Sequence, residues 1–408
     1  MTLSAAPRFP GILAVALALG CASHPPAPAA SHAGPQGGAP PTSSMASVPL
    51  APQSARPHLR VGTSGDYAPF SVRDAQGTVR GFDAEIADAL ARDLGFELEW
   101  VSFRWPTLQR QVQNGEFDVA MGGVTWQPSR GVLGYLTRAV ARGGPCVLGD
   151  EQAQRVAVNH GGVLEVWARS HFANRELVIV EANQTLPELL ASGRAGAIVT
   201  DSFERKAFER PGWKVRCEPA LARKVYWLAP NHAELAVRID DWLRTHADRI
   251  EGAQQRWFGE RQPLNAIDNL ADLLARRMAF MPLVAGAKAK LALPIEDLPR
   301  EKIVLDSAAA NAQKVGLPEA AARDFFALQI ELSKAVQRRT SEVTTLDLAQ
   351  QIRPALNELG DRVLLAVVEA RGAGQLATSS LADLAVLSPW LSDQERQRLL
   401  DSLKALGR

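Results

Sequence analysis

Hydrophobic and polar residues follow two different periods in the two halves of the chain. In the first half, short apolar runs such as residues 59–63 alternate with segments whose apolar residues recur every three or four positions. The clearest of these segments, residues 81–95, gathers its apolar residues on one helix face and ends on a glycine: Phe82, Ile86, Ala89, Leu90 and Leu94. Strands that alternate with amphipathic helices predict a parallel α/β sheet.

The strand and helix order then repeats. Apolar runs at residues 155–162, 176–182 and 195–201 are separated by two further helical segments. Two such units joined by hinge strands predict a two-lobed α/β domain over residues 58–262, with a cleft between the lobes.

Strand signals end after about residue 262. Apolar residues then recur near the helical period: Ile267, Leu270, Leu274, Met278 and Met281. Further helices are predicted at residues 301–315, 318–342, 345–351, 354–371 and 376–407, so residues 263–408 are expected to form an all-α bundle. The apolar stripes alone are equally compatible with an oligomerising or scaffold domain.

The N-terminus carries the pattern of an export signal. Arg8 precedes the apolar run 11–20, which is too short to span a bilayer, and Cys21 follows it. The sequence ALGC resembles a bacterial lipoprotein processing site with Cys21 as the lipidated residue; a soluble product cut nearby is the alternative. Residues 22–57 are rich in Pro, Ala, Ser and Gly, which predicts a tether. We therefore expect a periplasmic protein, with a lipid anchor as its contact with the membrane.

Charge and cysteine content narrow the classes of ligand. The 45 basic and 44 acidic residues nearly cancel, which gives no sign of a nucleic-acid partner. Beyond Cys21 only Cys146 and Cys217 remain; in an oxidising compartment such a pair favours a disulfide, which would stabilise the fold by roughly 4 kcal/mol for a loop of about 70 residues. Two buried free thiols are the alternative. The seven histidines lack metal-ligand spacing, and we expect neither metal nor cofactor.

Several residues of the first half suit the binding of a carboxylate in the cleft. Arg130 offers a guanidinium fork and Thr125 a hydroxyl group, although a structural ion pair is the alternative for Arg130. Asp66 and Trp105 fall at strand ends, where α/β sheets place ligand contacts; Trp105 is also compatible with a place in the core.

Polar residues also stand at core-facing positions of the predicted bundle. They are Arg277, Lys288, Asp297, Arg300, Ser333, Gln337 and Arg362. Arg277 and Lys288 are about three helical turns apart and share a face, as do Ser333 and Gln337 at i,i+4 spacing. Because cations outnumber carboxylates in this set, a dianionic ligand would satisfy them.

Motifs of the first half resemble a known family over about residues 57–260. GDYAPF (65–70), the helix 81–95, FRWPTLQRQVQNGEFDVAMGGVT (103–125), Arg130 and VTDSFE (199–204) resemble the type II periplasmic solute-binding fold, and more closely the exported cyclohexadienyl dehydratases. These enzymes convert prephenate to phenylpyruvate and arogenate to phenylalanine. The resemblance implies that Glu204 is the general acid, with Asp201 and Glu165 in reserve, and that Asn159 is retained as a substrate contact.

Three positions depart from this family. Pro145 occupies a hinge position at which the dehydratases usually carry lysine, and Val163 and Leu164 replace a Thr-Asn pair. His160 or Arg142 would supply the missing polarity. The alternative is a lobe pair that captures an amino acid or aromatic acid without turning it over.

The polar set of the second half resembles the helical chorismate mutases, in their secreted single-chain branch, over about residues 265–408. The motifs are ARR at Arg277, GAKAK at Lys288, LPIEDLPR, the Ser333/Gln337 pair and GDR at Arg362. The resemblance implies the following roles: Arg277 and Arg362 bind the two substrate carboxylates near Arg300, Lys288 and Gln337 donate to the ether oxygen, and Asp297 and Ser333 hold the ring hydroxyl and polar edge. At position 337 some secreted members carry glutamate.

Together the resemblances predict an exported bifunctional enzyme that takes chorismate through prephenate to phenylpyruvate, with arogenate as a further candidate substrate. A mutase fused to a non-catalytic receptor domain is the alternative. A homo-oligomer is compatible with the sequence.

Overall fold

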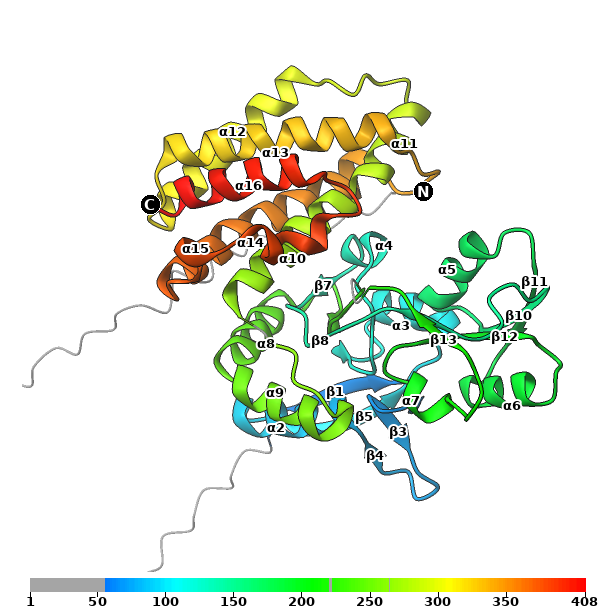
Figure 1. Cartoon of the computed structure of the whole chain (residues 1–408). Coiled ribbons are helices and arrows are strands. Elements are labelled where there is room, and N and C mark those ends of the chain that lie inside the picture. Colours follow the sequence, from blue (N-terminus) through cyan, green and yellow to red (C-terminus); the bar gives the residue numbers. More distant parts are fainter. Residues whose placement is uncertain (1–55, 220–221, 264) are drawn as a thin grey trace, which may run out of the picture.

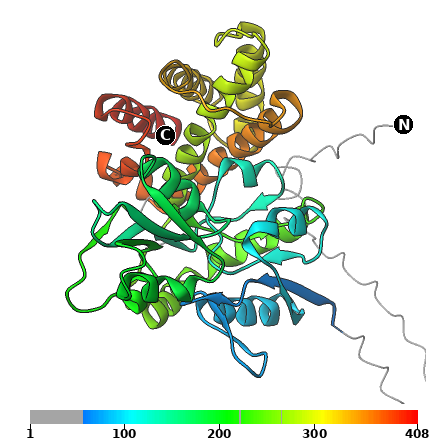
Figure 2. The same cartoon turned by 90° about the vertical axis from the view of Figure 1, so that its right-hand side faces the viewer.

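The computed structural model describes residues 56–219, 222–263 and 265–408. The expected export signal, Cys21 and almost all of the expected tether lie outside the described residues. In the described part, a two-lobed α/β region lies against a bundle of helices (Figures 1 and 2).

The first lobe is built on a five-stranded sheet in the order β5-β1-β6-β15-β7. Its strands are β1 (His58–Thr63), β5 (Glu97–Ser102), β6 (Val119–Ala120), β7 (Tyr135–Leu136) and β15 (Trp227–Leu228). β1 runs parallel to β5 and β6, as expected from the alternating pattern. Its helices are α2 (Phe82–Leu94), α3 (Leu108–Gln113), α4 (Pro128–Gly131), α8 (Ala233–Thr245) and α9 (Ala247–Phe258), and a small sheet joins β2 (Asp66–Tyr67), β3 (Ser71–Arg73) and β4 (Val79–Arg80).

The second lobe has the sheet order β11-β10-β12-β9-β13. Its elements are β9 (Pro145–Gly149), β10 (Arg155–Asn159), α5 (Val163–His171), β11 (Glu176–Val180), α6 (Leu186–Ala191), β12 (Ala197–Asp201), α7 (Arg205–Phe208) and β13 (Val215–Cys217). A disulfide joins Cys146 to Cys217 across the antiparallel pair β9 and β13. The chain passes between the lobes through two antiparallel hinge strands, β8 (Ala141–Gly143) and β14 (Ala222–Lys224).

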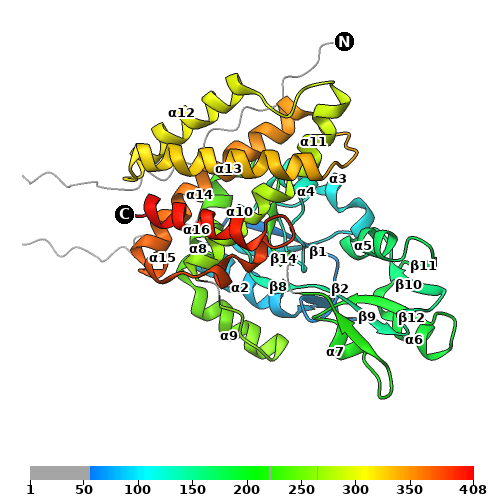
Figure 3. The same ribbon diagram turned by 45° about the horizontal axis from the view of Figure 1, so that its top comes forward.

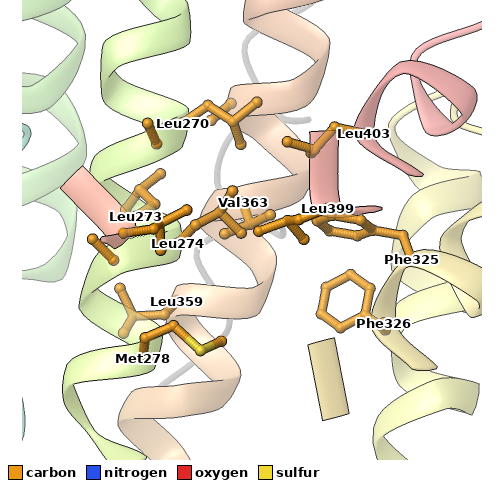
Figure 4. Close-up of a cluster of buried hydrophobic side chains, with 14 of the residues drawn as sticks. Leu270, Leu273, Leu274, Met278, Phe325, Phe326, Leu359, Val363, Leu399 and Leu403 are labelled. Carbon is orange, nitrogen blue, oxygen red and sulfur yellow. The ribbon is translucent and has the colours of Figure 1, made fainter. Parts of the chain in front are cut away.

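The described residues of the second half form helices and connecting loops, with no strand among them. Its longer helices are α10 (Ala266–Ala279), α11 (Met281–Lys290), α12 (Leu298–Lys314), α13 (Glu319–Arg339), α14 (Arg353–Gly372) and α16 (Asp393–Leu406). Side chains from α10, α13, α14 and α16 meet in one apolar core, which includes Leu270, Leu274, Phe325, Val363 and Leu399 (Figure 4). Among the described residues, no helix has both the length and the apolar character needed to cross a membrane.

Local capping changes the helix boundaries that periodicity predicts. The single helix expected at residues 376–407 is divided into α15 (Gln375–Thr378), a 3-10 segment (Leu381–Leu387) and α16. Capping boxes at Ser380 and Ser392 start the second and third pieces. The expected helix at residues 345–351 is a π-helical turn, Leu348–Ile352, capped by Asp347.

Candidate functional sites

A cavity of about 260 Å³ lies between the two lobes of the α/β region. Six of the predicted site residues line it, from both lobes: Trp105, Thr125, Arg130, Asn159, Asp201 and Glu204. Asn159 ends β10 and Asp201 ends β12, so two of them stand at the carboxyl ends of parallel strands.

Glu204 is almost completely buried at the start of α7, with 2% of its surface exposed. Asn183 donates from Nδ2 to both carboxyl oxygens, at 2.7 and 2.8 Å, and Thr200 Oγ1 donates to Oε2 at 2.9 Å. Burial and the nearby Asp201 carboxylate raise the pKa of Glu204 well above its usual value. This environment favours the protonated form of the Glu204 carboxyl group.

Lys224, which the sequence analysis did not identify, lines the cleft and contacts both lobes. Its Nζ is 3.0 Å from Asp201 Oδ2 of the second lobe, and it also donates to Tyr67 Oη at 2.8 Å and to Thr125 Oγ1 at 3.2 Å in the first. Lys224 comes from hinge strand β14, whereas Pro145 belongs to β9. The cleft therefore contains a lysine although Pro145 stands at the position where one was expected.

Arg130 lies on the first-lobe side of the cavity. It donates from Nη1 to the carbonyl oxygen of Thr125 at 2.5 Å, and its guanidinium carbon is 5.6 Å from the ring centre of Trp227. Burial lowers the pKa of Arg130 to about 10. The group remains charged at neutral pH, and no ion pair to a carboxylate joins it among the described residues, which leaves its charge for an anionic ligand.

Two of the predicted cleft residues do not line the cavity. The main chain of Asp66 takes part in a lobe contact, since its carbonyl oxygen accepts from Gln184 Nε2 at 2.7 Å, but its side chain is not among the lining groups. Glu165 accepts from the Gly161 amide at 2.6 Å and pairs with Arg169. These contacts outweigh its partial burial and lower its pKa, so Glu165 is not suited to hold a proton.

The two residues expected to replace the missing polarity also lie elsewhere. His160 is exposed and contacts Glu181 at 3.0 Å, and Arg142 forms a 2.7 Å ion pair with Asp268 of the helical half. Asn183 and Lys224 supply the polarity instead. Sequence spacing did not mark either, because Asn183 is held by a short 3-10 turn and Lys224 by the strand that returns to the first lobe.

A second cavity, of about 330 Å³, lies inside the helical half. Six predicted residues line it: Arg277, Lys288, Asp297, Arg300, Ser333 and Gln337. Lys334 and Arg353 line it as well and were not predicted. Five cations and three carboxylates surround the cavity, namely Arg277, Lys288, Arg300, Lys334 and Arg353 against Asp297, Glu301 and Asp361. The excess of two positive charges suits a dianion.

Two cations of this cavity, Arg277 and Lys288, donate hydrogen bonds to neutral groups. Arg277 donates from Nε to Gln329 at 2.9 Å and from Nη1 to the Leu356 carbonyl at 2.7 Å. Lys288 donates to the Ile295 carbonyl at 2.5 Å. Burial lowers the pKa of both, to about 10 for Arg277, which therefore remains charged at neutral pH.

The other side of the cavity is organised by Asp297, the N-cap residue of α12. Its Oδ1 accepts from the Arg300 amide at 3.1 Å, and its Oδ2 accepts from Arg353 Nη2 at 2.9 Å. The Arg300 side chain donates to Asn357 at 2.8 Å. One carboxylate thus places two arginines at the cavity wall.

One atom of the Gln337 side-chain amide is available to a ligand. Its Nε2 is 3.5 Å from the sulfur of Met281, and its Oε1 is buried without a hydrogen-bond partner in the described part of the chain. Because an amide can rotate by half a turn, Gln337 can present either a donor or an acceptor to a ligand.

Arg362, which was predicted to bind a substrate carboxylate together with Arg277, does not line this cavity. Arg362 points out of the bundle toward the first lobe, where it donates to the Leu136 carbonyl at 2.6 Å and lies 3.6 Å from Asp240. It lines a separate cavity between the two halves of the chain. The helical phase explains the error: Arg353 precedes Arg362 by nine residues, two and a half turns, and so occupies the opposite face of α14.

Comparisons with known proteins agree with the two halves of the chain. Residues 59–260 match the bacterial extracellular solute-binding proteins, family 3, and residues 261–338 match chorismate mutase type II. The cyclohexadienyl dehydratase of Pseudomonas aeruginosa is 29% identical over 232 residues, which cover 50% of this chain and 84% of that protein. The monofunctional chorismate mutase of Enterobacter agglomerans is 32% identical over 154 residues, which cover 35% of this chain and 84% of that protein.

A solved structure is also similar to the first half. The crystal structure of an ancestral amino acid-binding protein, a precursor of cyclohexadienyl dehydratase, matches 49% of this chain and 95% of its own, with 27% identity and a TM-score of 0.46. The chain carries a family 3 solute-binding domain homologous to cyclohexadienyl dehydratase, and through its helical half it belongs to the chorismate mutase family.

Proposed function

We propose that this protein catalyses two consecutive reactions, chorismate to prephenate in the helical half and prephenate to phenylpyruvate in the two-lobed half. The observation that carries the proposal is the buried Glu204 carboxyl group, whose raised pKa provides a proton donor inside the cleft. A receptor needs no such donor. The relatives support the pairing, because one is a chorismate mutase and the other a cyclohexadienyl dehydratase.

In the helical half, the chemistry requires binding and charge stabilisation rather than proton transfer. Chorismate rearranges by a pericyclic shift, so the site must hold the reactive conformer and stabilise charge on the breaking ether bond. Arg277, Arg300 and Arg353, which line the cavity, would bind the two carboxylates, and Lys288 and Gln337 would donate to the ether oxygen. Asp297 and Ser333 would contact the ring hydroxyl group and the polar edge of the substrate.

In the cleft, dehydration requires a proton for the departing hydroxyl group. Glu204 would donate this proton, so that the hydroxyl leaves as water while the ring carboxylate leaves as carbon dioxide and its bonding electrons complete the aromatic ring. Arg130 and Thr125 would bind the side-chain carboxylate. Lys224 adds a cation beside Asp201, and Trp105 and Asn159 complete the lining. Arogenate is a candidate second substrate, which would yield phenylalanine by the same steps.

A two-substrate assay tests the pairing. Purified residues 56–408 should release phenylpyruvate from prephenate at neutral pH above the uncatalysed background, and should also consume chorismate. If chorismate disappears and prephenate accumulates, the two-lobed half is a binding domain, and Val163 and Leu164 become the explanation.

A pH profile tests the role of Gln337. Because glutamine does not titrate, mutase activity should change less than about twofold between pH 5 and 8. The Gln337→Glu variant, by contrast, should lose activity as pH rises through the pKa of the new carboxyl group, since only its protonated form can donate to the ether oxygen. A steep loss above pH 6 in the unmodified protein would contradict this role.

We further propose that the protein is exported to the periplasm and anchored by lipid on Cys21. The extracellular solute-binding family supports export, and so does the secreted chorismate mutase of Yersinia pestis, which is 41% identical over 69 residues, 17% of this chain and 37% of that protein. Metabolic labelling with a fatty acid, compared between the natural chain and Cys21→Ser, tests the anchor.

A further inference from the structure

One helix of the mutase half faces both sites. Helix α10 places Arg277 in the mutase cavity, and on its neighbouring face it carries Asp272 and Arg276. Asp272 lies 3.1 Å from Arg223 of hinge strand β14 and 2.7 Å from Arg276. Both Asp272 and Arg276 are almost completely buried, at 3% and 2% exposed. Figure 3 shows α10 on the side of the bundle that faces β14 and β8.

The strand that α10 contacts is the one that carries the cleft lysine. Arg223 and Lys224 are consecutive on β14, and successive side chains of a strand point to opposite faces. The Arg223 side chain reaches the bundle, while Lys224 reaches Asp201 and Thr125 in the cleft. The position of Lys224 Nζ therefore depends on where β14 is held.

A second contact supports the same wall of the cleft. Phe280, at the end of α10, meets the ring of Trp126 edge to face with centroids 6.1 Å apart, and Trp126 lines the cleft. The guanidinium of Arg276 lies 5.6 Å from the Trp126 ring centre, and its Nη1 donates to the Thr137 carbonyl at 3.0 Å. The main chain links the two contacts, because the Trp126 amide donates to the Arg223 carbonyl at 2.8 Å.

We propose that Asp272 of the mutase half is a positioning residue for the dehydratase cleft. Through Arg223 it fixes β14 and so places Lys224 against Asp201, and through Arg276 it supports Trp126. The mutase bundle is thus part of the framework of the other site. The inference rests on the proposed dehydratase function for its kinetic consequence, but the effect on β14 is independent of it.

The test compares Asp272→Asn with Glu369→Gln. Glu369 also forms an ion pair across the two halves, to Arg138 at 3.1 Å, but it lies on α14 and touches neither β14 nor a cleft residue. Asp272→Asn should lower kcat for prephenate about tenfold and leave mutase kcat within about twofold, whereas Glu369→Gln should change neither by more than about twofold. Equal losses in both variants would mean that docking of the halves in general is responsible, and would overturn the positioning role.

The pH profile separates positioning from simple loss of structure. Burial and Asp201 raise the pKa of Glu204, and Lys224 lowers it. If Lys224 moves away, the pKa rises further, so the alkaline limb of the Asp272→Asn dehydratase profile should move to higher pH. An unchanged profile with reduced amplitude would contradict the proposal.

Hydrogen exchange gives a readout that does not depend on turnover. Backbone amides of residues 222–228 should exchange faster in Asp272→Asn than in the natural chain and in Glu369→Gln. Unchanged exchange overturns the proposal, even if the natural chain proves inactive on prephenate and the proposed function itself fails. If Asp272→Asn does not fold, because two buried arginines lose their partner, Arg223→Met removes the same contact while Asp272 keeps Arg276, and the same results are expected.

Discussion

Replacing Glu204 with glutamine should lower kcat for phenylpyruvate formation about 10²- to 10⁴-fold, the range expected when a general acid is removed. Glutamine preserves the size of the side chain and can still accept from Asn183 and Thr200, but it has no acidic proton. Because Glu204 lies in the two-lobed half and contacts no mutase residue, chorismate consumption should stay within about twofold. Both rates can be measured on one preparation, with the uncatalysed decay of prephenate subtracted.

Glu209 provides the matched control. It follows α7 five residues after Glu204, is exposed, and pairs loosely with Arg205 at 3.8 Å. Glu209→Gln should therefore leave both activities within about twofold. Unaltered phenylpyruvate formation in Glu204→Gln would show that another group donates the proton. Asp201, which lines the same cavity and forms an ion pair with Lys224, is then the next candidate.

The two-lobed fold and much of its cleft could be predicted from the sequence, because several cleft residues stand at the ends of predicted strands. Asp201 and Asn159 come directly after apolar runs that become parallel neighbours, so the sheet brings them to one edge. Lys224 escaped prediction because its strand is three residues long and returns antiparallel through the hinge, where no period marks which residue faces the cleft. Its only local signal is a lone lysine beside an apolar strand.

In the helical half, residue type was a better guide than position within a helix. Arg277 and Lys288 do line one cavity, but the expected shared helix face is wrong, because α10 ends at Ala279 and α11 begins at Met281 between them. On α14 the sequence analysis selected Arg362, whereas Arg353 lines the cavity. Apolar residues surround both arginines in the sequence, so the hydrophobic pattern does not distinguish them. A helix that packs against neighbours on opposite sides has two buried faces, and periodicity does not say which one borders the cavity.

This ambiguity leads to a direct comparison of Arg353→Met with Arg362→Met in the mutase reaction. Arg353 lines the cavity beside Asp297 and shares its helix face with Asn357 and Gly360, which also line it. Losing a charged hydrogen bond to a substrate carboxylate costs about 1.5–3 kcal/mol, so kcat/KM for chorismate should fall about 10- to 150-fold in Arg353→Met. Steady-state loss of chorismate absorbance measures it.

Arg362→Met removes the same charge from the opposite face of the same helix. Arg362 contacts the Leu136 carbonyl and Asp240 of the first lobe, so its loss should leave mutase kcat/KM within about threefold and act on the docking of the two halves instead. Thermal unfolding of both variants checks that neither effect comes from a damaged bundle. If Arg362→Met proves the more damaging change in the mutase assay, the cavity inside the bundle is not the mutase site as assigned. Equal losses in the two variants would also contradict this assignment, because Arg353 and Arg362 line separate cavities on opposite faces of α14 and cannot both bind one chorismate molecule.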